Sequence, residues 1–129
     1  MKIPESISAL STKHNILWTF CMWILSFTGI CFMCPFNETF AIIAFLSCAC
    51  IGFIGLLPLV KDTLNTAHNI LGIGGCLLSQ LWCGLVGNWQ FLIAGWLLYL
   101  ILLPFMKSKW CFFAEIWCLL NIIIVRFIL

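Results

Sequence analysis

The stretch that decides the fold is TFAIIAFLSCACIGFIGLLPLV, residues 39–60. It contains no charged residue, and it is about as long as the roughly 20 residues that a helix needs to cross the hydrocarbon core of a bilayer. Four more apolar stretches of comparable length occupy residues 15–34, 66–86, 90–106 and 110–129. The sequence therefore predicts an all-α membrane protein, a bundle of five antiparallel transmembrane helices.

The composition indicates that lipid is the solvent for most of the surface. The chain has 129 residues, of which 64% are hydrophobic and 8% are charged, whereas a soluble domain carries about 25% charged residues. The apolar runs do not alternate with polar residues as barrel strands do, so helices are expected. The net charge of +2 offers no basic patch, and no nucleic-acid partner is expected. We predict a polar cytoplasmic leader, residues 1–14, and one transmembrane domain, residues 15–129.

The lysines indicate an orientation. All of them fall in the leader, the second turn and the fourth turn, which share one side of a five-span bundle: Lys2, Lys13, Lys61, Lys107 and Lys109. Positively charged loops favour the cytoplasmic side. The prediction is an N-terminus inside and a C-terminus outside the lipid bilayer, in the cytoplasmic (inner) membrane if the source is bacterial.

Small residues recur every four positions in two of the spans. One set lies in residues 39–60 and consists of Ala44, Cys48 and Gly52, and the other lies in residues 66–86 and consists of Gly75, Ser79, Cys83 and Gly87. Small side chains at this spacing let helix backbones approach closely. We expect these faces to pack against each other within the chain, or to bind a second copy or another membrane protein.

Polar residues near or inside the spans mark candidate sites, because burying them in lipid is costly. They are Asp62, His68, Asn69, Gln80, Glu115, Asn121 and Arg126. His68 and Asn69 begin the third span, and Glu115 lies roughly 8–9 Å into the fifth from the same side. Asp62, His68, Asn69 and Glu115 are thus candidates for one cytoplasm-facing polar pocket. The alternative is that His68 caps a helix and a protonated Glu115 bonds to a neighbouring helix.

Nine cysteines occur, and most fall inside spans, where a thiol acts as a small apolar residue. Cys31 and Cys34 stand apart because they form a C-x-x-C pair at the predicted outer end of the first span, where thiols exchange disulfides. The outer turns hold no second cysteine pair to receive electrons. With two histidines in the whole chain, a zinc site would need ligands from separate helices, so no metal and no cofactor are expected.

The segment GFIGLLP, residues 52–58, is followed ten residues later by His68. This pattern resembles that of uncharacterised bacterial small multi-pass membrane proteins, in which a Gly-x-x-Pro motif ends one helix and a histidine opens the next. The resemblance covers about 20 of the 129 residues. It implies that His68 is a residue of functional interest.

Three functions follow from these features. The leading hypothesis is a non-enzymatic accessory or scaffold subunit that packs through its small-residue helix faces. The alternative is a carrier for a small solute or lipid, with a polar pocket around His68 and Glu115. A second alternative is a thiol oxidoreductase that uses Cys31 and Cys34.

Overall fold

A computed structural model describes residues 15–57 and 62–128. These residues form helices only and contain no strand, so the all-α prediction is confirmed for them. The α-helices are α1 (Asn15–Met33), α2 (Ala41–Leu56), α3 (Asp62–Val86), α4 (Trp89–Met106) and α5 (Trp110–Phe127), and the short 3-10 segments are η2 (Cys34–Phe36), η3 (Glu38–Phe40) and η4 (Lys107–Lys109). The predicted leader, residues 1–14, lies outside the described residues.

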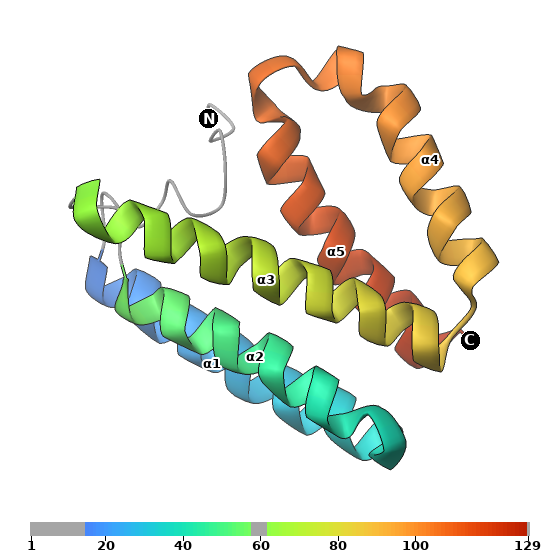
Figure 1. Ribbon diagram of the computed structural model, residues 1–129, viewed down its shortest axis with the longest axis horizontal. Helices are drawn as coiled ribbons and strands as arrows, with labels where there is room; N and C mark the ends of the chain where they lie inside the picture. The colour runs from blue at the N-terminus through green and yellow to red at the C-terminus, as the bar shows by residue number, and fades with distance from the viewer. Residues whose placement is uncertain (1–14, 58–61, 129) are drawn as a thin grey trace.

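Four helical segments of the described chain are long and apolar enough to cross a membrane: Ile16–Phe36, Glu38–Leu56, Asn65–Val86 and Trp89–Phe127. This number agrees with a membrane protein. The last segment has 39 residues and includes α4, η4 and α5. It is not one straight rod, because the chain reverses direction at η4 (Figure 1). Lys107 marks the reversal with φ 51° and ψ −128°, a backbone conformation that no helix contains.

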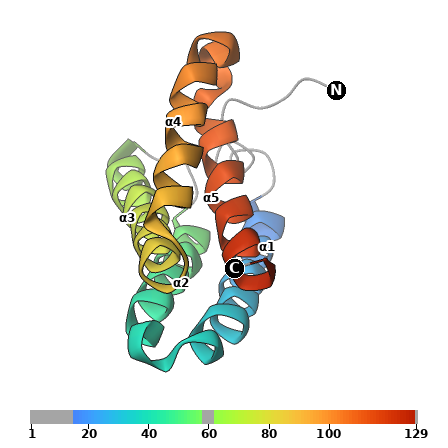
Figure 2. The ribbon, with the colours of Figure 1, turned by 90° about the vertical axis from the view of Figure 1, so that its right-hand side faces the viewer.

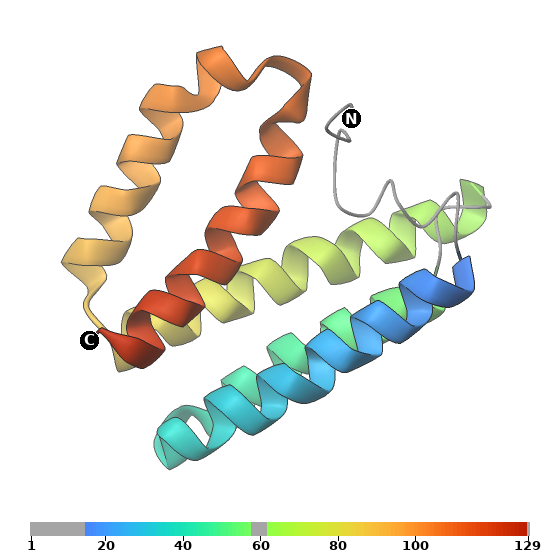
Figure 3. The same ribbon diagram turned by 180° about the vertical axis from the view of Figure 1, so that it is seen from behind.

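The helices form two groups. α1, α2 and α3 lie side by side, and the α4–α5 hairpin is inclined to them (Figures 1 and 3). Figure 2 shows the hairpin extending beyond the ends of these three helices, with α5 meeting α3 near the C-terminus of both. The core lies where all five α-helices meet, and its buried residues are Met33, Ala44, Cys48, Trp82, Cys83, Leu92 and Val125.

α1 and α2 are joined by hydroxyl groups and glycines. Ser26 donates a hydrogen bond from Oγ to the carbonyl of Cys48 at 2.7 Å, and Thr19 does the same to Gly55 at 2.7 Å. A Cβ placed on Gly52 would lie 3.0 Å from the Ser26 hydroxyl, and one on Gly29 would lie 2.7 Å from Cys48 Sγ. The Cys48 and Gly52 positions of the small-residue face on α2 are therefore occupied by α1.

α2 and α3 approach closely at Gly75. Ser47 Oγ donates to the Gly75 carbonyl at 2.8 Å, and a Cβ on Gly75 would lie 3.2 Å from Cys50 Cβ. α2 therefore uses two different faces, one toward α1 and the next toward α3.

Two helix boundaries differ from the predicted spans. The second span was predicted to run to residue 60, but α2 ends at Leu56. Leu57 leaves the helix with φ −117° and ψ 68° because the ring of the next residue, Pro58, disfavours helical geometry before it. α3 begins at Asp62, four residues before the predicted Thr66. An acidic residue in the first turn favours a helix start, which a hydropathy pattern does not detect.

Candidate functional site

The most developed polar constellation joins α3, α4 and α5 at Gln80. The Gln80 Oε1 atom accepts hydrogen bonds from Asn121 Nδ2 at 2.7 Å and from Trp96 Nε1 at 3.1 Å. Its Nε2 donates to the Cys118 carbonyl at 3.3 Å and to Ser79 Oγ at 3.2 Å. Gln80 is 8% exposed and Asn121 is 2% exposed. We name these residues, Ser79, Gln80, Trp96, Cys118 and Asn121, the Gln80 network.

The Gln80 network satisfies polar groups where no water can do so. Lipid offers no hydrogen-bond partners, so an amide inside the bilayer must bond to protein. Each bond of Gln80 reaches a different group, and three of its partners lie on other helices. The network therefore joins the α4–α5 hairpin to α3.

A cavity of about 300 Å³ borders this network between α4 and α5. Trp117 Nε1 is buried there and has no hydrogen-bond partner among the described residues. A Cβ on Gly95 would lie 3.5 Å from the Trp117 ring, so a side chain larger than alanine at this position would fill part of the cavity. The lining residues are Phe91, Ala94, Gly95, Leu98, Trp117, Leu120, Asn121 and Ile124, and all but Asn121 and Trp117 are wholly apolar.

Glu115 lies close to a group of thiols. Its carboxyl is near Cys76 on α3 and near Cys111 and Cys118 on α5. Within the described ranges, no three histidine, cysteine, aspartate or glutamate side chains are grouped so as to hold a metal ion. The arrangement ties α5 to α3 one turn from the Gln80 network.

His68 lies near the start of α3, away from the Gln80 network near the end of that helix. It is 2% exposed, and its Nδ1 donates to the carbonyl of Leu57 at 2.5 Å. Its ring stacks on Trp18 of α1 with the ring centroids 6.4 Å apart. His68 therefore connects α3 to the end of α2 and to α1 from a position inside α3, not from the start of the helix.

The other predicted pocket residues are dispersed or not described. Asn69 is exposed on α3, and the side chain of Asp62 lies outside the described part. Glu115 is near thiols of α3 and α5, whereas His68 contacts α1 and the residue after α2. A pocket shared by Asp62, His68, Asn69 and Glu115 stays a prediction.

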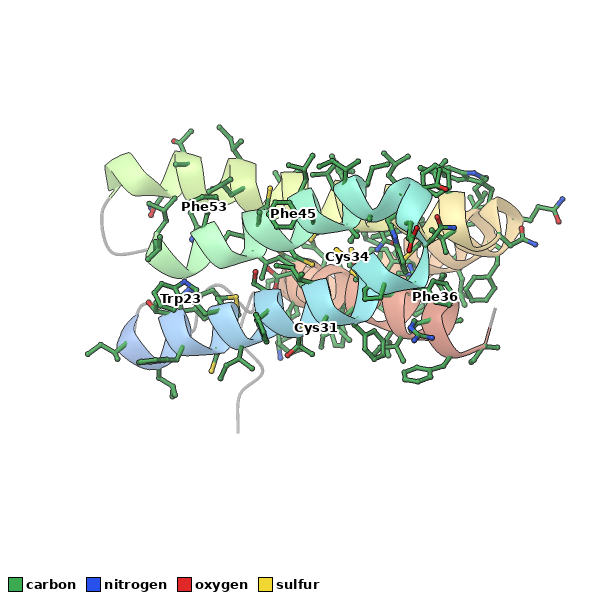
Figure 4. All side chains as sticks on the ribbon, turned by 90° about the horizontal axis from the view of Figure 1, so that it is seen from below. Trp23, Cys31, Cys34, Phe36, Phe45 and Phe53 are labelled. Carbon is green, nitrogen blue, oxygen red and sulfur yellow. The ribbon has the colours of Figure 1, made fainter. Side chains whose placement is uncertain are left out.

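The Cys31–Cys34 pair is split between two sides of α1. Cys31 is exposed and lies on the side away from α2, whereas Cys34 faces α2 and donates from Sγ to the Ala41 carbonyl at 3.6 Å (Figure 4). Both thiols are free. Disulfide formation would need Cys34 to leave Ala41 and turn toward Cys31.

The small residues predicted to form one face of the third span have different neighbours in the structure. Gly75 meets α2, as described above, and Ser79 donates to the carbonyl of Cys76 at 2.7 Å. Cys83 is buried in the core, and a Cβ on Gly87 would lie 3.0 Å from Val125 of α5. On α2, Ala44 is likewise fully buried. These residues pack inside the chain rather than forming one continuous exposed face.

Arg126 has a role that sequence reasoning did not identify. Its guanidinium carbon lies 4.6 Å from the centre of the Phe36 ring and 5.3 Å from that of Phe32. These cation–π contacts hold the end of α5 against the end of α1. The sequence shows that Arg126 is followed by an aromatic residue, Phe127. It does not show the contacts with Phe32 and Phe36, because these residues lie about ninety positions earlier.

Comparisons with known proteins returned no relative. No protein-family model, no curated protein and no solved structure matches this chain.

Proposed function

We propose that the chain is a five-span membrane protein, N-terminus inside and C-terminus outside, that serves as a non-enzymatic accessory or scaffold subunit in the cytoplasmic (inner) membrane. The geometry of α4 and α5 supports five crossings. Each helix has 18 residues, which at 1.5 Å per residue is about 27 Å, close to the roughly 30 Å of a bilayer core. Since the chain reverses at η4, the two helices cross separately, and Lys107 and Lys109 then lie on the cytoplasmic side.

The observation that carries the subunit role is the sparse packing of the α4–α5 hairpin. Only 11% of the apolar window in Trp89–Phe127 is buried, against 33% in Asn65–Val86. On α4 the buried residues are Leu92 and Tyr99 alone. The hairpin is thus held by the Gln80 network, by the core residues Leu92 and Val125, and by the contacts of Arg126, while much of its remaining surface is exposed.

The cavity between α4 and α5 gives this surface a shape that a partner helix fits. It is apolar, it contains a glycine where a backbone can approach, and its Trp117 N–H has no acceptor among the residues that the structure describes. A transmembrane helix presents side chains of matching size and backbone or hydroxyl oxygens that accept from an indole. Lipid chains fill such a cavity too, but they offer no acceptor at that depth.

The alternative functions have weaker support. The carrier hypothesis requires a water-accessible His68, and this ring is buried between Trp18 and the Leu57 carbonyl. The oxidoreductase hypothesis requires Cys31 and Cys34 to meet, and the Cys34 thiol donates instead to the Ala41 carbonyl at 3.6 Å. We therefore keep the subunit role as the proposal.

Site-specific photo-crosslinking in membranes tests it. A photoreactive residue replaces Leu98, which lines the cavity, and in a control variant it replaces Ile24 of α1, which is 65% exposed. The proposal predicts a crosslinked protein at Leu98, either a second copy or another membrane protein, and adducts with lipid only at Ile24. Lipid adducts alone at both positions would refute a partner on the α4–α5 hairpin.

A further inference from the structure

A second crevice lies at the tip of the α4–α5 hairpin, in the segment between Trp96 and Cys118 of the Gln80 network. It has a volume of about 490 Å³ and is open to the surroundings. Its floor consists of apolar side chains from the end of α4 and the first turns of α5, and its rim is η4. The lining residues are Leu102, Phe105, Met106, Lys107, Ser108, Lys109 and Phe113.

The rim carries two lysines, and among the described residues no acidic side chain pairs with either. These are Lys107 and Lys109, which stand on either side of Ser108. Glu115, the nearest acid in sequence, has thiol neighbours on α3 and α5. Two ammonium groups and a hydroxyl therefore point to an anionic ligand that carries hydrogen-bond acceptors.

The backbone of the rim is held in an uncommon conformation. Lys107 is the only residue other than glycine with a positive φ in the described ranges, and its φ of 51° with ψ −128° is costly for a side chain with a Cβ. Glycine would adopt this conformation freely, yet the sequence places a lysine there. A need for a positive charge at this position would explain why the residue is lysine and not glycine.

The floor distinguishes a lipid from a soluble anion. Phe105 is 80% exposed and lines the same crevice as the two lysines, together with Leu102 and Phe113. A soluble phosphate would leave these side chains uncovered, whereas the acyl chains of a phospholipid cover them while the headgroup meets the lysines. The crevice thus matches both halves of an amphiphile.

We propose that this crevice binds an anionic phospholipid of the adjacent leaflet, with the headgroup phosphate on Lys107 and Lys109 and an acyl chain along Phe105. The proposal uses the five-span topology only to place η4 at a membrane surface, and it is independent of any protein partner. Attraction of about 1 kcal/mol per lysine corresponds to about a five-fold preference for each.

The test is native mass spectrometry of the full chain released from nanodiscs of equal phosphatidylglycerol and phosphatidylcholine. We expect wild type to retain phosphatidylglycerol in preference to phosphatidylcholine, and K107Q/K109Q to lose most of this preference. R126Q removes one charge at the opposite end of α5 and is the control, which keeps the preference. K107R/K109R keeps both charges and should retain binding, which separates charge loss from a folding defect.

Three results would overturn the proposal. They are an unchanged lipid preference in K107Q/K109Q, an equal loss in R126Q, and displacement of phosphatidylglycerol by millimolar inorganic phosphate, which would indicate a site for free anions. A fourth contradicting result would be loss of binding in K107R/K109R, since the arginine guanidinium groups keep both positive charges. None of these readouts depends on whether a crosslinked partner is found at Leu98.

Discussion

At the scale of single residues, Gln80 decides how the second half of the chain is placed. Its side chain accepts from Trp96 and Asn121 and donates to the Cys118 carbonyl. The sequence marks Gln80 and Asn121 as polar residues in lipid, but 41 positions separate them, and no spacing rule pairs residues on different helices. Hydropathy therefore predicts that such groups need partners and leaves the partners themselves unknown.

Replacing Gln80 by leucine should destabilise the protein. Trp96 Nε1 and Asn121 Nδ2 would lose their common acceptor while staying buried, at a cost of about 1–3 kcal/mol. Unfolding by SDS titration, followed by tryptophan fluorescence, measures the change. Gln90→Leu is the matched control, because Gln90 is exposed and its hydrogen bond to Asn88 uses the backbone N–H, so the variant should unfold like wild type.

A double-mutant cycle sharpens this test. Gln80→Leu and Asn121→Leu should be non-additive by about 0.5–1.5 kcal/mol, the range measured for hydrogen bonds between transmembrane helices. Additive effects would mean that the two amides do not interact in the membrane, and the seating of α5 on α3 would need another cause.

His68 is a second residue for which the subunit proposal and the carrier hypothesis predict different results. His68→Phe keeps an aromatic ring against Trp18 and removes the donor to Leu57, so we expect a loss of about 1 kcal/mol in stability. Crosslinking at Leu98 should be unaffected, because His68 contacts α1 and the end of α2. A folded His68→Phe protein that lost its crosslink or its cellular phenotype would revive the carrier hypothesis.

At the scale of helices, close contacts at glycine decide the packing. The repeat of small residues predicted that α2 and α3 approach closely, and Gly75 against Ser47 and Cys50 shows this approach. The repeat did not reveal that Cys48 and Gly52 face α1. Ser26 and Thr19 of α1 bond to the backbone of α2, and hydroxyl-to-carbonyl bonds of this kind leave no periodic signal.

Two glycines of α3 should respond in opposite directions to alanine. A Cβ on Gly84 would lie 2.6 Å from the Trp89 ring, which would have to move, whereas one on Gly74 would meet nothing within 4 Å. Gly84→Ala should cost about 1–3 kcal/mol by overpacking. Gly74→Ala should gain up to about 1 kcal/mol, since alanine favours a helix.

Thermal unfolding in a mild detergent compares both variants with wild type. If Gly84→Ala were as stable as Gly74→Ala, the contact between α3 and the start of α4 would be looser than the structure has it.

At the scale of the whole molecule, the sequence predicts the helical class well and the shape poorly. Long apolar runs require helices in lipid, and the described residues are helical. The hairpin of α4 and α5 is inclined to α1, α2 and α3 (Figure 1), and nothing in hydropathy indicates that angle. It follows from contacts between distant residues, namely the Gln80 network and the Arg126 contacts with α1.

The topology has a direct consequence for accessibility. With five crossings, η4 lies in the cytoplasm and the Gly87–Asn88 turn lies outside. A fluorescent protein that folds only in the cytoplasm should therefore emit when it is fused after Lys109. The same protein fused after Asn88 should not emit, because it would lie outside. Emission from both fusions would show that α4 does not cross the membrane, and the four-segment count would then be the better description.

The central claim is that the α4–α5 hairpin is a protein-binding surface. The most direct test is to measure the mass of the complex that the protein forms in its native membrane. Extraction with a lipid-retaining polymer, followed by native mass spectrometry, reports what accompanies the 14.7 kDa chain. The account predicts a complex with a second copy or another membrane protein, which Leu98→Trp, by filling the cavity, dissociates. A 14.7 kDa monomer that carries lipid alone, in wild type and variant alike, would contradict it.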